Sequence, residues 1–450
     1  MEKTVTVVGL GKLGAPLAAC LAARGLRVIG VDADPRRVEA VQRGVAPVFE
    51  PGLAEMLQAA GGRLTTSPDL VAAVAASEIT FIVVPTPSEP NGGFSLRFVL
   101  PACEAIGRAL STKVGFHLVV LTSTVMPGST GGPVKSALEQ ASRKGCGHDF
   151  GLCYSPEFIA LGSVIRDFLN PDFVLIGESD ERSGNILAGV YSEVCENKPK
   201  AARMNFVNAE ITKLALNTYV TTKISFANML ARICERLPEA DVDEVTAALG
   251  LDSRIGSKYL KGAVSYGGPC FPRDNLALVN LARRIGAPSQ IAEVTHEFNH
   301  LQIEWLANAV RSYLPGGGCA GILGLTYKTN TDVIEQSVGL LLAQELSDHG
   351  APVVAFDPVG NLRAAETLGT KVRIASTAQE CIEQADVVVV ATPWPAFHGI
   401  PAYRWARERS PRVVIDCWRL LSHLDASSGI VYLPLGTGEF ERIQLHRQAV

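Results

Sequence analysis

The sequence predicts an α/β protein in which a helical segment separates two parallel β-sheets. Near both ends of the 450-residue chain, short runs rich in Val and Ile alternate with helix-like segments. Strands that are buried on both faces of a parallel sheet have such continuous apolar runs, and the helices between them cover the faces. The middle of the chain carries helix-like patterns instead. Three folding units also fit the length, because a domain usually has about 100 to 200 residues.

Four apolar runs of strand length predict the first sheet. They read TVTVVGLG (4–11), RVIGVDAD (27–34), EITFIVVPTP (78–87) and FHLVVLTST (116–124). The segments between them include helix-like stretches such as LAACLAARG (17–25). Strands that alternate with helices in this way are typical of a doubly wound parallel sheet.

A long helix is predicted in the middle of the chain, because residues 205–237 run for 33 residues without proline or glycine. Asp241 and Asp243 follow Pro238 and predict the start of a second helix. The segment after this helix, up to residue 275, is rich in loop-forming residues. Further helices are expected before residue 314.

A glycine-containing linker at 315–320 precedes a third region whose apolar runs resemble those of the first. GILGLTYK, PVVAFDP, ADVVVVATPW and RVVIDCW correspond to the four runs above, and this echo fits duplication and convergence equally. We therefore expect two Rossmann-like doubly wound parallel-sheet domains, joined by a long central helix and a helical middle domain. The expected boundaries are 1–200, 201–314 and 315–450.

Composition excludes several classes of function. Lys and Arg number 41 against 45 Asp and Glu, a net charge of -4, and no long run has a single sign, which argues against a nucleic-acid partner. The ten cysteines form no CxxC pair and no cluster with His at zinc spacing, so neither a disulfide framework nor a metal site is expected. The start of the sequence lacks a signal-peptide pattern, and no apolar run approaches the ~18 residues of a membrane span. These features predict a cytoplasmic protein without a membrane partner.

A glycine motif, GLGKLG, follows the first predicted strand and opens the first predicted helix. In this context Gly9 allows a tight turn, Gly11 lets the backbone approach a pyrophosphate, and Gly14 lets the helix pack on the strand. The N-terminus of the helix can then bind the anion. Asp32 ends the second strand, where it can accept hydrogen bonds from a ribose hydroxyl pair. An acid at this position favours NAD over NADP, so NAD is the expected cofactor.

Two later strand ends lie at the edge of the sheet where cofactors bind in such folds. They read VVPTP (83–87) and TSTV (122–125), and on their own both would be ordinary turns. Asp34, which precedes Pro35, is expected to cap a helix rather than to bind a ligand. The predicted cofactor-binding residues are Gly9, Gly11, Lys12, Leu13, Gly14, Asp32, Pro85, Thr86 and Thr124.

A lysine and an asparagine on the long helix form a candidate oxyanion site. Lys213 and Asn217 are four residues apart and share a helix face, with Glu210 one turn earlier. Aimed together, the two side chains could hold an oxyanion. A solvated polar stripe on an exposed helix would give the same pattern, but the apolar residues around the pair favour the functional interpretation.

Cys270 is the candidate nucleophile, within SYGGPCFPRDN (265–275). Glycines permit close approach of a ligand, prolines stiffen the loop, and Asp274 follows one helical turn later. A thiolate can add to an aldehyde, and the thiohemiacetal can give up a hydride to become a thioester that water releases as an acid. The alternative is a small buried residue, which we expect of most other cysteines.

Such a reaction also needs a carboxylate that manages protons and water. Glu157 follows the strand-like run FGLCYS (150–155) and is a candidate for this role. A glutamate after proline could equally open a helix, where an acid interacts favourably with the helix dipole. The two interpretations stay open on the residues alone.

Together these segments resemble the UDP-glucose/GDP-mannose dehydrogenase family. The matching segments are GLGKLG, VPTP, STV, SPEF, AEITKLALNTYVTTKISFAN, GLDSRIGSKYLKGAVSYGGPCFPRD and LGLTYKTNTD, in the family's order. The resemblance implies two Rossmann-like domains joined by a long helix that also forms a homodimer contact. It implies oxidation of the C6 hydroxymethyl of a nucleotide sugar to a carboxylate with two NAD reduced, and UDP-glucose is the favoured substrate.

The resemblance also implies roles for individual residues. Cys270 matches the nucleophile, Lys213 and Asn217 the oxyanion pair, and Asp274 an acid that assists proton transfer. Thr124 and Glu157 match residues that hold the catalytic water, and Glu157 matches a base. The implied substrate-binding residues are Glu157, Phe158, Ile159, Ala160, Lys213, Asn217, Arg254 (toward a partner subunit's substrate), Tyr259, Tyr266, Gly267, Lys328 and Arg419.

Four positions depart from the family's usual pattern. Leu161 stands where an acid is common, Phe173 and Glu335 where arginines are frequent, and Arg273 where a lysine is usual. These departures keep another nucleotide sugar, such as a UDP-hexosamine or GDP-mannose, as an alternative substrate. A two-electron hydroxyacid dehydrogenase is a second possibility, although that reaction needs neither Cys270 nor a third domain. A cofactor-binding protein without catalysis is a third.

Overall fold

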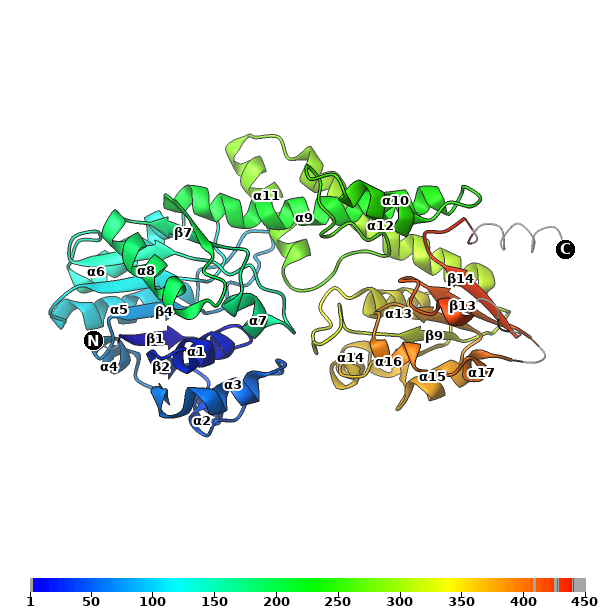
Figure 1. Cartoon of the computed structure of the whole chain (residues 1–450), viewed down its shortest axis with the longest axis horizontal. Helices are drawn as coiled ribbons and strands as arrows, with labels where there is room; N and C mark the ends of the chain where they lie inside the picture. The colour runs from blue at the N-terminus through cyan, green and yellow to red at the C-terminus, as the bar shows by residue number, and fades with distance from the viewer. Residues whose placement is uncertain (1–2, 408–409, 425–426, 428, 439, 441–450) are drawn as a thin grey trace. The chain divides into compact units, whose positions relative to one another are not determined.

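The computed structural model describes residues 3–407, 410–424, 427, 429–438 and 440 (Figure 1). It forms two compact units. The first extends to Leu216 and includes Asn280–Ala287, and the second contains Asn217–Val279 and the chain from Pro288 onward. Residues 441–450 of the expected third domain lie outside the described residues.

The first unit contains an eight-stranded sheet in the order β3-β2-β1-β4-β5-β6-β7-β8. All neighbouring strands are parallel except β6 and β7, which are antiparallel, so the predicted parallel sheet is extended by a reversed pair. The strands are β1 (Thr4–Val8), β2 (Arg27–Val31), β3 (Leu64–Thr66), β4 (Ile79–Ile82), β5 (His117–Leu121), β6 (Phe150–Tyr154), β7 (Phe173–Glu178) and β8 (Lys200–Met204).

Helices alternate with these strands, and apolar side chains form a core on each face of the sheet. Asp34 accepts a hydrogen bond from the Arg36 backbone N–H and caps α2, as predicted. The helical elements are α1 (Gly14–Ala23), α2 (Pro35–Gln42), α3 (Leu53–Ala60), η1 (Gly61–Arg63), α4 (Leu70–Ala75), α5 (Val99–Thr112), η2 (Thr130–Val134), α6 (Lys135–Ser142), α7 (Val164–Leu169) and α8 (Glu181–Val194).

The second unit contains a six-stranded parallel sheet in the order β11-β10-β9-β12-β13-β14. Its strands are β9 (Ala320–Leu323), β10 (Val353–Phe356), β11 (Arg373–Ile374), β12 (Val387–Val390), β13 (Arg412–Asp416) and β14 (Ile430–Pro434). Its helical elements are α13 (Val338–Asp348), α14 (Asn361–Leu368), η3 (Gly369–Lys371), α15 (Ala378–Gln384), α16 (Pro395–His398), α17 (Ala402–Trp405) and η4 (Ser422–Leu424). The third region therefore forms the second Rossmann-like sheet, as predicted.

The predicted long helix is α9 (Phe206–Cys234), which begins in the first unit and ends in the second. It ends three residues before the predicted limit. Asp241 caps α10 (Val242–Gly250) by accepting a hydrogen bond from the Asp243 backbone N–H. The middle region also contains α11 (Phe271–Ile285) and α12 (Gln290–Tyr313). Among the described residues, no helix combines the length and apolar character that crossing a membrane requires.

Candidate functional site

The glycine motif forms a tight turn between β1 and α1. The Gly9 N–H donates to the Val31 carbonyl at 2.7 Å, and Gly9 has a φ of +100°, which glycine adopts without strain. A Cβ on Gly14 would lie 1.8 Å from the Gly9 carbonyl oxygen, so a side chain there would force α1 away from β1. At Gly11 the nearest atom to an added Cβ is Arg37 Nη1 at 3.7 Å, which leaves the backbone accessible. These are the three properties that a pyrophosphate-binding turn needs.

Asp32 lies directly after β2 and holds this turn in place. Its Oδ2 accepts the Leu10 N–H at 2.6 Å, and its Oδ1 accepts the Asp34 N–H at 2.8 Å. Arg37 Nη1 is 3.5 Å from Oδ2. Each carboxylate oxygen has further acceptor capacity. Asp32 can therefore bind a ribose diol while it keeps its structural bonds.

The loops after β4 and β5 are joined to each other at the same edge of the sheet. The Thr86 hydroxyl donates to the Thr124 carbonyl at 2.7 Å, and the Ser123 hydroxyl donates to the Val84 carbonyl at 2.6 Å. Because the strand order reverses between β1 and β4, this edge contains the crevice in which such sheets bind dinucleotides. The sequence-predicted residues Pro85, Thr86 and Thr124 thus lie at the edge that the glycine turn also occupies.

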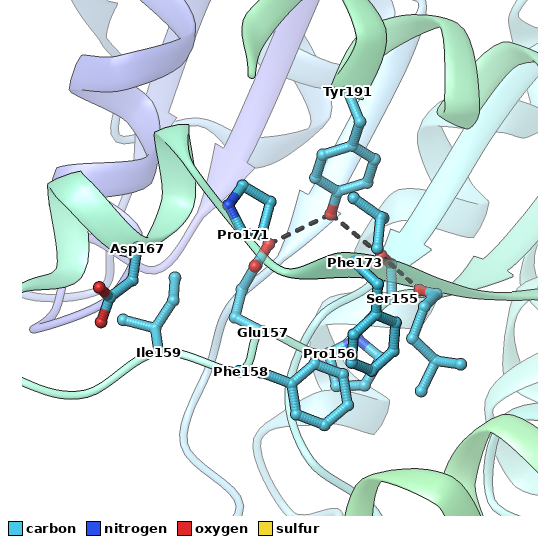
Figure 2. Close-up of a pocket in the computed structure, with 11 residues that line it drawn as sticks. Ser155, Pro156, Glu157, Phe158, Ile159, Asp167, Pro171, Phe173 and Tyr191 are labelled. Carbon is cyan, nitrogen blue, oxygen red and sulfur yellow. Dashed lines mark hydrogen bonds between the residues drawn. The ribbon is translucent and has the colours of Figure 1, made fainter. Parts of the chain in front are cut away.

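Glu157 lies in a small pocket that is built from the loop after β6, the start of β7 and helix α8 (Figure 2). The Tyr191 hydroxyl donates to Glu157 Oε1 at 3.1 Å and is 3.0 Å from Ser155 Oγ. Desolvation raises the pKa of Glu157 to about 7, although the Tyr191 hydrogen bond and the Lys213 charge oppose the shift. A carboxyl group with a pKa near neutrality can both accept and release a proton at physiological pH.

Lys213 is fixed beside this pocket. Its Nζ donates to the Glu157 backbone carbonyl at 2.7 Å and lies 4.6 Å from the centre of the Phe158 ring. Phe173, one of the departures from the family pattern, packs on Phe158 with ring centres 4.9 Å apart. The structure therefore brings Glu157, Phe158 and Lys213 together. Glu210, one helical turn earlier, instead accepts the Gly128 and Thr130 N–H groups at 2.6 and 2.8 Å.

In the second unit, Cys270 lies immediately before α11. The Asp274 N–H donates to the Cys270 carbonyl at 2.8 Å, which places Asp274 in the first turn of the helix as expected. Asp274 Oδ2 accepts Asn217 Nδ2 at 2.6 Å. All ten cysteines lie within the described residues, and Cys270 is exposed whereas the other nine are buried or half-buried. The interpretation of Cys270 as a buried filler residue is therefore wrong.

The segment before Cys270 is clamped by two asparagines that the sequence analysis missed. Asn299 on α12 exchanges two hydrogen bonds with the Tyr266 backbone, at 2.8 and 3.0 Å. Asn228 on α9 accepts the Ala263 N–H at 2.8 Å and donates to the Val264 carbonyl at 2.7 Å. Asn228 is eleven residues after Asn217, close to three full helical turns, and this periodicity could have identified it. Asn299 carries no comparable signal.

The two glycines of this segment serve the chain's own packing. A Cβ on Gly267 would lie 2.1 Å from the Gln336 carbonyl oxygen, and one on Gly268 would lie 2.7 Å from the Tyr327 ring. The Gly268 N–H also donates to the Glu335 carbonyl at 3.0 Å. Close packing within the chain thus requires glycine at both positions. That these glycines also admit a ligand stays a prediction.

The remaining predicted substrate residues have varied surroundings. Arg254 is exposed and pairs with Asp252 at 2.7 Å. Tyr259 is exposed, with a φ of +65°, and its ring centre is 6.3 Å from that of Phe271. Lys328 Nζ lies 5.9 Å from the centre of the Tyr327 ring. In the loop after β6, Ile159 lines the Glu157 pocket and the Ala160 N–H donates to Asp167 Oδ2 at 3.3 Å.

Arg419 has a structural role in the second unit. Its guanidinium makes two hydrogen bonds of 2.8 Å to the Asp243 carboxylate and donates to the Gly262 and Leu435 carbonyls. These bonds occupy all three of its nitrogens. The predicted substrate contact of Arg419 stays a prediction.

Sequence comparison identifies the origin of this arrangement. Residues 3–195 match the NAD binding domain, 207–301 the central domain and 321–423 the UDP binding domain of one dehydrogenase family. The chain belongs to the UDP-glucose/GDP-mannose dehydrogenase family. Like the family, it is a nucleotide-sugar dehydrogenase that uses NAD, and the glycine turn with Asp32 fits that cofactor.

Individual relatives cover nearly the whole chain. The UDP-glucose 6-dehydrogenase AglM of Haloferax volcanii is 34% identical over 93% of this chain and 97% of its own length. A GDP-mannose 6-dehydrogenase of Azotobacter vinelandii is 31% identical, with 88% and 93% covered. The solved UDP-glucose dehydrogenase of Pyrobaculum islandicum has a TM-score of 0.88 and 34% identity, with 97% and 98% covered. Family members with different sugar nucleotides in their names are thus similarly distant.

Proposed function

We propose that this protein oxidises the C6 hydroxymethyl of UDP-glucose to a carboxylate in two successive NAD-dependent steps. The observation that carries the proposal is the exposed Cys270 directly before α11, because Asp274 in the first turn of that helix accepts a hydrogen bond from the buried Asn217 on α9. A two-electron hydroxyacid dehydrogenase needs no cysteine nucleophile. The names of relatives such as AglM support UDP-glucose as the substrate.

In the first oxidation the C6 alcohol loses a hydride and a proton and becomes an aldehyde. Bound NAD supplies the hydride acceptor in both oxidations. We assign Lys213 and Asn217 to stabilise the oxygen that carries developing negative charge, because both are nearly buried donors on the same face of α9. Asp274, hydrogen-bonded to Asn217, assists the transfer of the alcohol proton.

In the second oxidation the Cys270 thiolate adds to the aldehyde carbon and the oxygen takes up a proton. The thiohemiacetal then loses a hydride and that proton to become a thioester. Water adds its oxygen to the acyl carbon, the carbon–sulfur bond breaks with its electron pair on sulfur, and one water proton passes to Glu157. Thr124 and Glu157 are assigned to hold this water.

The identity of the sugar needs a direct test, because the chain departs from the family's usual pattern at Leu161, Phe173 and Glu335. A panel of UDP-glucose, UDP-hexosamines and GDP-mannose should give the highest kcat/KM with UDP-glucose. A higher kcat/KM with another sugar nucleotide would reassign the substrate without changing the two-step chemistry.

We also propose a homodimer through α9 and three functional domains with boundaries near residues 200 and 314. Tyr219, Phe226, Met229 and Ile233 on α9 are 40 to 64% exposed, an unusual density of apolar side chains for a surface helix. Light scattering should give twice the chain mass, and Phe226→Asp should shift the protein toward the monomer. A wild-type monomer would contradict the proposal.

The decisive experiment measures NADH formed from limiting UDP-glucose. The wild type should form two NADH per sugar nucleotide, because both oxidations occur on the same molecule. Cys270→Ser should lose this yield, and Cys319→Ser, a half-buried thiol elsewhere in the second unit, should keep it. A wild-type yield of one NADH, or full turnover in Cys270→Ala, would favour a two-electron dehydrogenase. NAD binding without turnover on any sugar nucleotide would indicate a cofactor-binding protein.

A further inference from the structure

A row of four oxygen atoms begins at the half-buried Glu157 in the first unit and continues through the buried residues Tyr191, Ser155 and Leu175. Glu157 Oε1 is 3.1 Å from the Tyr191 hydroxyl, which is 3.0 Å from Ser155 Oγ, which is 2.9 Å from the Leu175 carbonyl (Figure 2). Tyr191 projects from α8, Ser155 follows β6, and Leu175 belongs to β7. Three secondary-structure elements thus hold four oxygens in a row at hydrogen-bond spacing.

The number of protons in this chain depends on the state of Glu157. The Leu175 carbonyl can only accept, and the Tyr191 and Ser155 hydroxyls carry one proton each. When Glu157 is ionised, two protons serve three oxygen–oxygen contacts. When Glu157 is protonated, three protons serve three contacts, and every bond points from Glu157 toward Leu175. Each of the three contacts can therefore be a hydrogen bond only after the Glu157 carboxyl group has taken up a proton.

We propose that Tyr191 and Ser155 are positioning residues that set the proton affinity of Glu157 in opposite directions. Tyr191 donates to the ionised carboxylate and stabilises it as a base. Ser155 offers the Tyr191 hydroxyl a second acceptor, so that Tyr191 can turn away and accept a proton held by Glu157. The catalytic meaning of this pair rests on the proposed function, in which Glu157 accepts a proton from the hydrolytic water.

The other polar groups near Glu157 cannot take over the role of Tyr191 and Ser155 at its carboxyl group. Lys213 on α9 lends its charge, but its hydrogen bond goes to the Glu157 backbone carbonyl and not to the carboxylate. Burial raises the pKa of Cys20 on α1 and of Cys195 on α8 to about 12, so both thiols are neutral at physiological pH. Asp167 on α7 accepts the Ser163 hydroxyl at 2.7 Å and the Ala160 N–H at 3.3 Å.

Two single-hydroxyl deletions test the proposal. Tyr191→Phe removes the donor to the carboxylate and should raise the Glu157 pKa by about one unit, because a hydrogen bond to a charged group is stronger than one to a neutral group. Ser155→Ala leaves the Tyr191 proton with Glu157 as its acceptor and should lower the pKa by about half a unit. Shifts of opposite sign are the expected signature.

The pKa is measured first in the resting enzyme, by infrared titration of the protonated carboxyl band with Glu157→Gln to assign it. Tyr154→Phe is the matched control, since Tyr154 lies on β6 beside Ser155 but belongs to the apolar core on one face of the sheet. This control should leave the Glu157 titration unchanged. If Ser155→Ala does not fold, Ser155→Cys should give a smaller shift in the same direction.

The pH dependence of kcat then tests the catalytic meaning. Its acidic limb should move to higher pH in Tyr191→Phe and to lower pH in Ser155→Ala. Shifts of equal sign, or no shift in the infrared titration, would overturn the proposal. Infrared shifts as expected in a protein that forms no NADH from any sugar nucleotide would instead overturn the proposed function and leave the hydroxyl pair standing.

Discussion

The two sheets of this protein use the same glycine turn for different purposes. Gly9 and Gly324 both follow the first strand of their sheet, with φ values of +100° and +98°. A Cβ on Gly14 or on Gly339 would lie 1.8 Å from the carbonyl oxygen of Gly9 or Gly324, respectively. Four residues separate the first pair of glycines and fourteen separate the second.

The carboxylates that follow the second strands show how the purposes differ. Asp357 occupies the position of Asp32, but its Oδ2 accepts the Leu325 and Thr326 N–H groups, the Thr326 hydroxyl and the Trp394 indole N–H. Its Oδ1 accepts two further backbone N–H groups. Asp357 is 1% exposed and has no oxygen available for a ribose. The longer second turn instead supplies residues 335–337, against which Gly267 and Gly268 pack.

The same backbone turn thus leaves its carboxylate open in the first sheet and supports the segment before Cys270 in the second. The two sheets also agree at the starts of their strands. Glu78, directly before β4, accepts the Thr4 N–H at the start of β1, and Asp386, directly before β12, accepts the Cys319 N–H directly before β9. Parallel sheets do not require such matching caps. The two sheets therefore match in this detail as well as in their apolar runs.

The largest expected effect comes from alanine at the second glycine of each turn. Gly14→Ala and Gly339→Ala should each cost at least about 3 kcal/mol of folding free energy, because the new Cβ collides with a backbone carbonyl. Thermal unfolding measures the loss. Gly62→Ala and Gly316→Ala are matched controls in the two units, since an added Cβ there meets no atom within 4 Å. A normal melting midpoint for Gly339→Ala would break the equivalence of the turns.

The next largest effect should distinguish Asp357 from Asp32 when each is changed to asparagine. Asp357→Asn should cost about 2 to 3 kcal/mol of stability, because buried donors lose a charged acceptor, and should leave the dissociation constant for NAD unchanged. Asp32→Asn should weaken NAD binding about tenfold with a smaller loss of stability. Calorimetry and thermal unfolding of both variants check this. Equal effects of the two variants on NAD would contradict the assigned difference.

A third difference lies at the start of equivalent strands, where β5 begins with His117 and β13 with Arg412. Burial lowers the pKa of His117 from 6.5 to about 3, so the folded state keeps it neutral. Its stabilising effect is complete above the unfolded pKa and is lost as pH falls from about 6.5 toward 3. The loss should reach about 2 kcal/mol at pH 5.

Denaturant unfolding between pH 7 and 5 measures this loss, and His117→Gln should flatten the dependence. Burial lowers the pKa of Arg412 only to about 10, so Arg412 stays charged throughout and adds no acid limb. A slope that persists in His117→Gln would assign the titration to another group.

The smallest expected effect concerns Trp394, whose indole N–H donates to Asp357 Oδ2 at 3.1 Å. Trp394→Phe should cost about 1 kcal/mol, because it removes one indole donor to a carboxylate. Trp418→Phe removes an indole donor to the Ala391 carbonyl and should cost less. Thermal unfolding of the two variants side by side checks the order, and a reversed order would show that Trp394 contributes mainly through packing.

Features that depend on neighbouring residues could be predicted from the sequence. The glycine turn with Asp32, the Asp34 cap, the long helix and the helical turn from Cys270 to Asp274 follow from steric rules, capping and periodicity over a few residues. The opposite strand direction of β7 could not be predicted, because apolar runs do not reveal the direction of a strand in a sheet.

The residues that hold the candidate site residues in place could be identified only in the tertiary structure. Tyr191 is 34 residues from Glu157, Asn299 is 33 residues from Tyr266, and Arg419 is 176 residues from Asp243. A tyrosine, asparagine or arginine has many possible partners in a sequence, and burial selects among them only when distant elements pack and their polar atoms must be satisfied. Local chemistry thus specified the glycine turn, the long helix and the position of Cys270 before α11, whereas long-range packing determined which hydroxyl faces Glu157 and which of Asp32 and Asp357 keeps acceptor capacity.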